Sequence, residues 1–177
     1  MLGLGYLKYP AYMKLLEKWA RKHLVKSVPD RFVGRGGVTL DDAWLEGLEA
    51  FWGVTVAGYP NLFFLIGPNS RVGHSSIVFM IEAQVHYVMQ CLKLMHKNQA
   101  TAIDVRPEAQ AQFNRSLQER MKRTVYASGC KSWYLDARGK NVILWPWFTC
   151  QYWMRTRRVK ASDYVFTTDS VIELVPS

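Results

Sequence analysis

The feature that most constrains this sequence is a continuous apolar run, Leu62–Ile66, with turn-forming residues on both sides. Such a run is typical of a strand buried on both faces, as in the parallel sheet of an α/β domain. Gly67-Pro68-Asn69 ends the run, and a long helix begins after a short loop, near Gly73 to Ser75. The sequence therefore predicts a strand, a tight turn and a helix in succession, and an α/β fold class.

The helix predicted from Ser75 to about His96 has a polar stripe at helical spacing along one side. The stripe consists of Glu82, His86, Gln90, Lys93 and Lys97, and apolar residues fill most other positions, among them Ile77, Ile81, Val85, Val88, Leu92 and Met95. This distribution predicts a helix that is mostly buried and has one edge in water. His86 is accordingly interpreted as a surface residue and Cys91 as a core residue.

The other elements follow from periodicity, capping residues and turn signals. They are a helix from Pro10 to near Pro29-Asp30, a glycine-rich loop at Gly34–Gly37, a helix capped by Thr39 that runs to about Phe51, a strand at Ala102–Val105, a helix that opens at Pro107, and a hairpin that joins Trp133–Leu135 to Val142–Trp145. No regular element is predicted for the aromatic and basic segment Phe148–Arg158, or for the tail that ends in Val171–Val175.

Length and composition exclude several classes of protein. The chain has 177 residues, of which 49% are hydrophobic and 21% charged, so a disordered or fibrous protein is not expected. No apolar run approaches the roughly 18 residues of a membrane-spanning helix. The N-terminus also lacks the pattern of a signal peptide. We therefore expect a soluble, cytoplasmic protein without a membrane span.

Positive charge is concentrated in one region of the chain. The net charge is +9, and residues 115–160 hold eleven Lys and Arg against only Glu119 and Asp136. A basic region of this kind can bind a polyanion. No helix-turn-helix signature, zinc-finger spacing or aromatic RNA-binding motif accompanies it. The sequence thus predicts a basic, solvated surface and no nucleic-acid partner.

The residues offer little conventional catalytic chemistry. Cys91, Cys130 and Cys150 are widely separated and are interpreted as reduced thiols, and the four His residues have no metal-ligand spacing. No Gly-x-Ser-x-Gly turn is present, so no catalytic residue and no metal ligand are predicted. The helix that follows Gly73 offers free N–H groups that suit a pyrophosphate or the polar edge of a flavin. Ordinary α/β connections share this feature.

Several separate motifs resemble, in the same order, those of the flavin-dependent Baeyer–Villiger monooxygenases, a branch of the flavin-containing monooxygenase superfamily. The central stretch reads Gly-Val-Thr-Val-Ala-Gly-Tyr-Pro-Asn-Leu-Phe-Phe from Gly53, then Gly-Pro-Asn-Ser from Gly67, then Gly-His-Ser-Ser-Ile from Gly73. Further matching pieces are Gly34–Leu40 leading to Trp44, Ile103–Glu108, Gly129–Tyr134 and the hairpin region Gly139–Pro146. The resemblance covers nearly the whole chain after residue 31.

The resemblance implies the C-terminal portion of such an enzyme: a partial FAD/NAD(P)-binding doubly wound domain with a β-hairpin extension. Residues 1–30 resemble a helical segment of the NADPH-domain half, and residues 31–177 resemble the C-terminal FAD-domain segment. The family uses FAD and NADPH to insert oxygen into ketones, and the cofactors carry the difficult chemistry. The residues implied near the cofactors are Gly67, Pro68, Asn69, Gly73, His74, Ser75, Ile77 and Trp133. Trp133 would lie on a segment that closes over the nicotinamide.

Two departures from the family pattern bear on activity. The GxGxxG and GxGxxA fingerprints of dinucleotide binding are absent, and Ala57 stands where the family motif Phe-x-Gly-x-x-x-His-x-x-x-Trp has His. We therefore expect a truncated fragment of an FAD- and NADPH-dependent monooxygenase that is not active alone. Two alternatives stay open. One is a non-catalytic interaction module or subunit that pairs with a partner chain carrying the GxGxxG half. The other is a basic domain that binds an anionic partner through residues 115–160.

Overall fold

The computed structural model describes residues 32–73, 75–125, 134–136 and 138–168. Their helices and strands are η3 (Arg35–Gly37), α2 (Leu40–Ala43), α3 (Ile77–Lys97), β1 (Ala102–Val105), α4 (Pro107–Met121), α5 (Thr149–Thr156), η5 (Ala161–Asp163) and β2 (Tyr164–Thr167). The chain divides into two compact units, Met1–Leu45 and Glu46–Ser177. The N-terminal helix predicted from Pro10 and the tail at Val171–Val175 lie outside the described residues.

The described part of the first unit is a glycine turn followed by one helical turn. The glycine-rich loop forms η3, and Val33 and Thr39 pair as an antiparallel bridge across it. Thr39 then caps α2 as expected, because its Oγ1 accepts a hydrogen bond from the N–H of Asp42 at 3.2 Å. The extension of this helix to about Phe51 is wrong. Helix α2 ends at Ala43, and Gly47 has a φ of 120°, which no helix accommodates.

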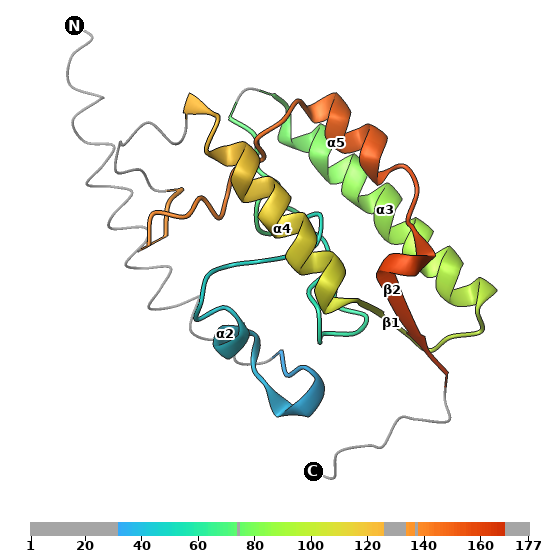
Figure 1. Cartoon of the computed structure of the whole chain (residues 1–177). Coiled ribbons are helices and arrows are strands. Elements are labelled where there is room, and N and C mark those ends of the chain that lie inside the picture. The colour runs from blue at the N-terminus through green and yellow to red at the C-terminus, as the bar shows by residue number, and fades with distance from the viewer. Residues whose placement is uncertain (1–31, 74, 126–133, 137, 169–177) are drawn as a thin grey trace, which may run out of the picture. The chain divides into compact units, whose positions relative to one another are not determined.

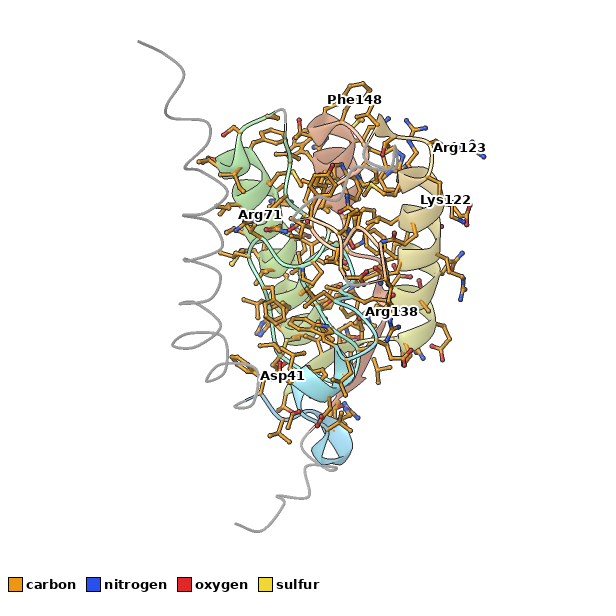
Figure 2. The ribbon with its side chains drawn as sticks, turned by 90° about the vertical axis from the view of Figure 1, so that its left-hand side faces the viewer. Asp41, Arg71, Lys122, Arg123, Arg138 and Phe148 are labelled. Carbon is orange, nitrogen blue, oxygen red and sulfur yellow. The ribbon has the colours of Figure 1, made fainter. Side chains whose placement is uncertain are left out.

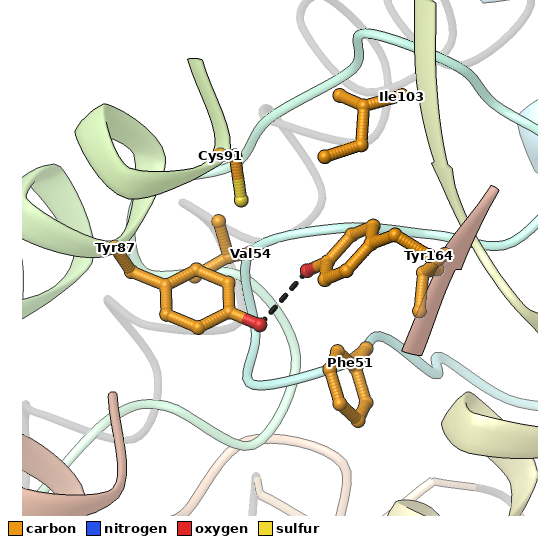
Figure 3. Packing of buried hydrophobic residues seen from close by; sticks show 7 residues of the cluster. Phe51, Val54, Tyr87, Cys91, Ile103 and Tyr164 are labelled. Carbon is orange, nitrogen blue, oxygen red and sulfur yellow. Dashed lines mark hydrogen bonds between the residues drawn. The ribbon is translucent and has the colours of Figure 1, made fainter. Parts of the chain in front are cut away.

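In the second unit, the irregular segment 46–72 lies between α4 and the pair formed by α3 and α5 (Figure 1). One hydrophobic cluster, built around this segment, contains Phe51, Val54, Tyr87, Cys91, Ile103, Val105 and Tyr164 (Figure 3). A second cluster joins α3, α4 and α5 and contains Met80, Ala83, Leu117, Met121, Leu144, Trp145 and Tyr152. Trp52 packs against both clusters, so it connects the two parts of the core.

Helix α3 confirms the predicted element to within two residues, and Cys91 is a core residue as expected. His86 is exposed, which confirms its interpretation as a surface residue. The expectation of a mostly buried helix with one wet edge is wrong. Between its buried face and its polar stripe, α3 carries further apolar residues that are exposed, namely Ile77, Val78, Val85, Met89 and Leu92; these form the second apolar face of the helix. No helix in the described part of the chain is long and apolar enough to cross a membrane.

Strand β1 and helix α4 occur where the sequence predicts them. Pro107 occupies the first turn of α4, where a missing N–H costs no hydrogen bond. Helix α5, the short 3-10 helix η5 and strand β2 were not predicted. Strand β2 pairs antiparallel with β1, with Ala102 opposite Thr167 and Val105 opposite Tyr164. Because the two strands are some 60 residues apart in the sequence, their pairing cannot be predicted from local sequence patterns.

The predicted strand at Leu62–Ile66 is wrong: this segment is irregular, and its backbone bonds go to scattered partners. The N–H of Phe64 donates to the carbonyl of Val54 at 2.7 Å, and that of Leu62 donates to Tyr59 at 3.2 Å. No neighbouring strand in the described part of the chain supplies a ladder. The parallel-sheet architecture of a doubly wound domain is therefore not formed by these residues, whose two-stranded sheet is antiparallel.

The predicted hairpin is present in a shortened form. Leu135 and Asn141 pair as an antiparallel bridge, and the N–H of Asp136 donates to the carbonyl of Lys140 at 2.9 Å. The N–H of Val142 still donates to the carbonyl of Tyr134 at 3.2 Å, and further along the second arm Leu144 pairs parallel with Arg71 instead. Trp133 lies outside the described residues.

A buried hydroxyl network lies at the centre of the first cluster. The hydroxyls of Tyr87 and Tyr164 are 2.9 Å apart, and Thr55 Oγ1 is 3.3 Å from the Tyr164 hydroxyl. Burial raises the pKa of Tyr87 and of Tyr164 well above the usual range. Burial also raises the pKa of the neighbouring Cys91 thiol from 9.0 to about 12.

These shifts predict that the protein loses stability in alkali. As pH rises above 9.0, the Cys91 thiol ionises in the unfolded chain but stays protonated in the folded one up to about 12. The free energy of unfolding should therefore fall by up to about 1.4 kcal/mol per pH unit from this group between those values. Urea titrations at pH 8, 9 and 10 measure this slope. The Cys91→Ala variant should show a shallower decline between pH 9 and 10, and an equal decline would contradict the assignment.

Candidate functional site

The turn after the apolar run has a strained backbone. Ile66 and Asn69 have φ values of 56° and 55°, in the left-handed region that few side chains adopt. A β-branched residue such as Ile66 pays a particularly high steric cost there. Strained residues of this kind persist only where the surroundings over-determine them, and they are frequent at ligand clamps. The turn Ile66–Ser70 is therefore the first part of the candidate site.

Three side chains hold this turn in place. Gln84 of α3 is fully buried, and its Oε1 accepts a hydrogen bond from the N–H of Ile66 at 2.8 Å. The Nδ2 of Asn69 donates to the carbonyls of Asn141 at 2.8 Å and Leu144 at 3.2 Å. Ser70 Oγ donates to the carbonyl of Gly67 at 2.6 Å. The turn is thus fixed to α3 on one side and to the hairpin arm on the other.

The backbone of Gly67 packs directly against the backbone of Gly53, so a side chain at Gly67 has no room. A Cβ at Gly67 would lie 2.5 Å from the carbonyl oxygen of Gly53, and a Cβ at Gly53 would lie 2.6 Å from Ser70 Cβ. The two glycines therefore let two backbone segments touch. Gly67 is among the residues that the resemblance places near the cofactors, and in this structure protein backbone lies in the space that a side chain at Gly67 would occupy.

The second part of the candidate site is the start of α3. Ser76 occupies the N-cap position, but its side chain makes no capping bond, and no other residue that the structure describes accepts a hydrogen bond from the first N–H groups of the helix. Ser75, Ser76, Ile77 and Val78 are all exposed there. Free N–H groups and the helix dipole favour a negative or strongly polar atom at this point.

Helix α5 begins beside the start of α3, and its N-cap Phe148 likewise lacks a side-chain capping bond. The hydroxyls of Ser75 and Thr149 are 3.5 Å apart, and further along the carbonyl of Arg157 lies 3.3 Å from His86 Nε2. The two helices therefore run parallel and present their N-termini at the same end. Phe148 is 67% exposed and marks this end in Figure 2.

The residues implied near the cofactors fall into two groups. Gly67, Pro68 and Asn69 belong to the strained turn, and Gly73, Ser75 and Ile77 lead into α3. No hydrogen bond among the described residues links the two groups. His74 and Trp133 lie outside the described residues. The cofactor roles of all eight residues stay predictions.

Sequence reasoning missed two residues that hold the site. Gln84 falls at the spacing of the buried positions Met80, Tyr87 and Cys91, and a polar residue on such a face is a signal of a specific hydrogen bond. No sequence pattern pointed to Thr149, because it lies at the start of α5, a helix that the sequence analysis did not predict.

The basic region is a solvated surface in the described structure. Its exposed members include Arg115, Arg120, Lys122, Arg123, Arg138, Arg155, Arg157, Arg158 and Lys160. Lys122 and Arg123 lie at the end of α4 (Figure 2). Arg155 and Arg157 lie over the rings of Trp147 and Trp153, 5.2 and 4.5 Å from the ring centroids. Within the described ranges, no cluster of three or more His, Cys, Asp or Glu could hold a metal ion.

Comparison with known proteins gives a consistent result. No family model matches the chain. A Baeyer-Villiger monooxygenase of Pseudomonas aeruginosa is 46% identical over 143 residues, which cover 80% of this chain and 27% of that protein. Another, from Streptomyces coelicolor, is 45% identical over 139 residues, or 77% of this chain. An FAD-binding monooxygenase of Aspergillus niger, ktnD, is 34% identical over 142 residues.

Solved structures agree with these relatives. A steroid monooxygenase bound to NADP superposes with a TM-score of 0.68 and 27% identity, over 77% of this chain and 26% of that one. The resemblance inferred from the motifs is therefore confirmed: the chain matches a partial region of the Baeyer–Villiger monooxygenases. The chain spans about 27% of the length of the Pseudomonas aeruginosa and Streptomyces coelicolor relatives.

The close contact of Gly53 and Gly67 yields a stability prediction. Gly67→Ala should lower the free energy of unfolding by about 2–3 kcal/mol, because the new methyl group meets the Gly53 carbonyl at 2.5 Å. Gly58→Ala is the control: its φ is +88°, but its Cβ would meet nothing within 4 Å, so only about 1 kcal/mol of backbone strain is expected. Urea unfolding of both variants measures the difference. Equal losses would argue against the steric account of Gly67.

Proposed function

We propose that this chain provides the flavin-facing region of a Baeyer–Villiger-type monooxygenase, which inserts oxygen into ketones with FAD and NADPH. The observation that carries the proposal is the strained turn Ile66–Ser70, which side-chain hydrogen bonds hold in place and which lies between the apolar run and α3, in the stretch whose motifs resemble the family. The Aspergillus niger relative is named as FAD-binding, and the steroid monooxygenase binds NADP. Both cofactors are thus implied by the family.

The free start of α3 suits a flavin. Its unpaired N–H groups can donate to the polar edge of the ring, where the helix dipole favours the negative charge of a reduced flavin. Ile77 and Val78 add exposed apolar surface at the same point, suitable for the flat ring face. When bound, the reduced flavin would supply the O₂ chemistry, and the residues here would orient the ring and shield it from water.

We further propose that this chain does not bind FAD tightly alone. The GxGxxG fingerprint that holds the pyrophosphate is absent from the sequence, and the cost of ordering a dinucleotide stays the same when half of its contacts are missing. A partner region with that fingerprint would supply the remaining contacts. We also propose that this chain and that partner region together form a doubly wound FAD domain.

One observation favours the second candidate, a non-catalytic interaction module. The second apolar face of α3 is exposed along the helix, and monomeric proteins rarely leave such a face uncovered. In that case the chain would bind a partner without supporting oxygen transfer.

A flavin-binding experiment tests the proposal. We expect weak FAD binding by the isolated chain, and retention of FAD when it is co-expressed with the P. aeruginosa relative lacking its 143 matched residues. Ile77→Asp should lower FAD retention by about tenfold, because a carboxylate would occupy the N–H groups at the start of α3. It should leave α3 folded, since helix N-termini favour acidic residues.

Flavin absorbance and fluorescence measure the bound FAD. Gln112→Asp, on an exposed position of α4, is the charge-matched control and should retain FAD like the wild type. Submicromolar binding by the isolated chain would contradict the dependence on a partner. Complexes that form normally but hold no FAD would favour the interaction module.

A further inference from the structure

The outward face of helix α5 combines aromatic, apolar and basic side chains. We propose that this face binds the surface of an anionic lipid bilayer, with Trp153 and Met154 inserted among the headgroups and the neighbouring arginines against the lipid phosphates. In this arrangement α5 lies along the membrane surface and does not cross it. The inference is independent of the proposed function, because it uses only the residues of α5 and those beside it.

The two faces of α5 are both partly apolar, but only one of them is covered. Tyr152 and Thr156 are buried, and the helix packs along α3 (Figure 1). On the outward face, Trp153 is 41% exposed and Met154 57%. Arg157 follows one turn later on the same face, at helical spacing from both. An amphipathic helix with Trp and Met beside basic residues has the composition of a helix that lies in a membrane interface.

Positive charge surrounds the exposed apolar side chains, and no acidic residue of the segment offsets it. Residues 147–160 contain no Asp or Glu, and their basic members are Arg155, Arg157, Arg158 and Lys160. All four are exposed, and none forms an ion pair with a residue that the structure describes. Each basic residue close to an anionic bilayer tightens binding by about fivefold. Charge complementarity therefore favours an anionic partner.

The arginines of this segment are held against tryptophan rings. The Arg157 guanidinium lies 4.5 Å from the ring centroid of Trp153, and the Arg155 guanidinium lies 5.2 Å from that of Trp147. Trp is enriched at the level of the lipid headgroups, where the ring contacts apolar chains and its N–H contacts water. Because each guanidinium stays beside its ring, an inserted Trp brings a cation to the depth of the lipid phosphates.

The same geometry is less suited to other anionic partners. Single-stranded nucleic acids bind through bases that stack on aromatic faces, but here guanidinium groups cover one face of Trp147 and of Trp153. Peptides dock in grooves or along sheet edges, whereas the outer face of a helix is convex. A bilayer requires no groove, because side chains that project from a convex face can insert between the headgroups. An anionic lipid surface is therefore the partner that fits.

Vesicle co-sedimentation tests this surface. The full chain is mixed with vesicles of phosphatidylcholine alone, and with vesicles of equal parts phosphatidylcholine and phosphatidylglycerol. We expect at least about tenfold tighter binding to the anionic vesicles, because the basic residues contribute only there. This preference should disappear when NaCl is raised to about 0.5 M, since salt screens the charges.

A double variant and a matched control locate the charges that bind. Arg157→Gln combined with Arg158→Gln should weaken binding to the anionic vesicles by at least about tenfold. Arg115→Gln combined with Arg120→Gln removes the same net charge from exposed positions of α4, which lies on the other side of segment 46–72 (Figure 1). This control should bind within about threefold of the wild type, because distant charges are screened.

Two further measurements test insertion of the apolar side chains. Met154→Asp should weaken binding by at least about tenfold, whereas Met89→Asp, at a 48% exposed position of α3, should not. Lipids brominated in their acyl chains should quench the tryptophan fluorescence of the bound chain, and Trp153→Phe should reduce this quenching. Far-UV circular dichroism verifies the fold of each variant.

Several outcomes would overturn the inference. They are an absence of binding to the anionic vesicles, equal binding to both kinds of vesicle, and equal losses in the α5 and α4 double variants. Binding to heparin as tight as binding to the vesicles, without quenching by brominated lipid, would assign the face to a soluble polyanion instead. Loss of binding in Met89→Asp but not in Met154→Asp would place the membrane-binding surface on α3.

Discussion

The packing of the Trp52 indole ring joins the two hydrophobic clusters of the second unit, and the rest of that unit depends on it. It packs 4.6 Å from Phe113, 6.0 Å from Trp145 and 6.1 Å from Tyr152, measured between ring centroids. These rings come from α4, the hairpin arm and α5, which are far apart in sequence. The Tyr152 hydroxyl also donates to the Trp52 carbonyl at 2.5 Å. One residue of the irregular segment thus fixes three elements, and the next residue, Gly53, meets the candidate site.

This arrangement explains how an irregular turn can be held in a strained shape. The turn Ile66–Ser70 has little secondary structure of its own, but the backbone of Gly53 packs against Gly67 within it. Gln84 accepts a hydrogen bond from the N–H of Ile66, and the Asn69 side chain donates one to the hairpin arm. Strain is tolerated because these contacts come from a rigid core. A loop fixed in this way can present the same geometry to a ligand each time, which favours a binding role over a purely connecting one.

The sequence was most informative where the signal is local. The 3.6-residue periodicity predicted α3 and its exposed His86, Pro107 predicted the start of α4, and Thr39 predicted the cap of α2. The motifs from Gly53 to Ile77 also identified the family region, because several short matches in order are specific. Whether Gly67, Asn69 and their neighbours contact a flavin stays a prediction, since a motif assigns a role without showing the contact.

The tertiary structure decided the features that depend on distant partners. Leu62–Ile66 has the composition of a buried strand, but a strand exists only with a neighbour to pair with, and the described residues supply none. Strand β2 forms because Tyr164–Thr167 meets β1, and Gly67 is small because Gly53 lies against it. Local propensity and capping act within a few residues and can be deduced from sequence. Strand pairing, backbone contact and the exposure of one helix face are set by which segments meet in space.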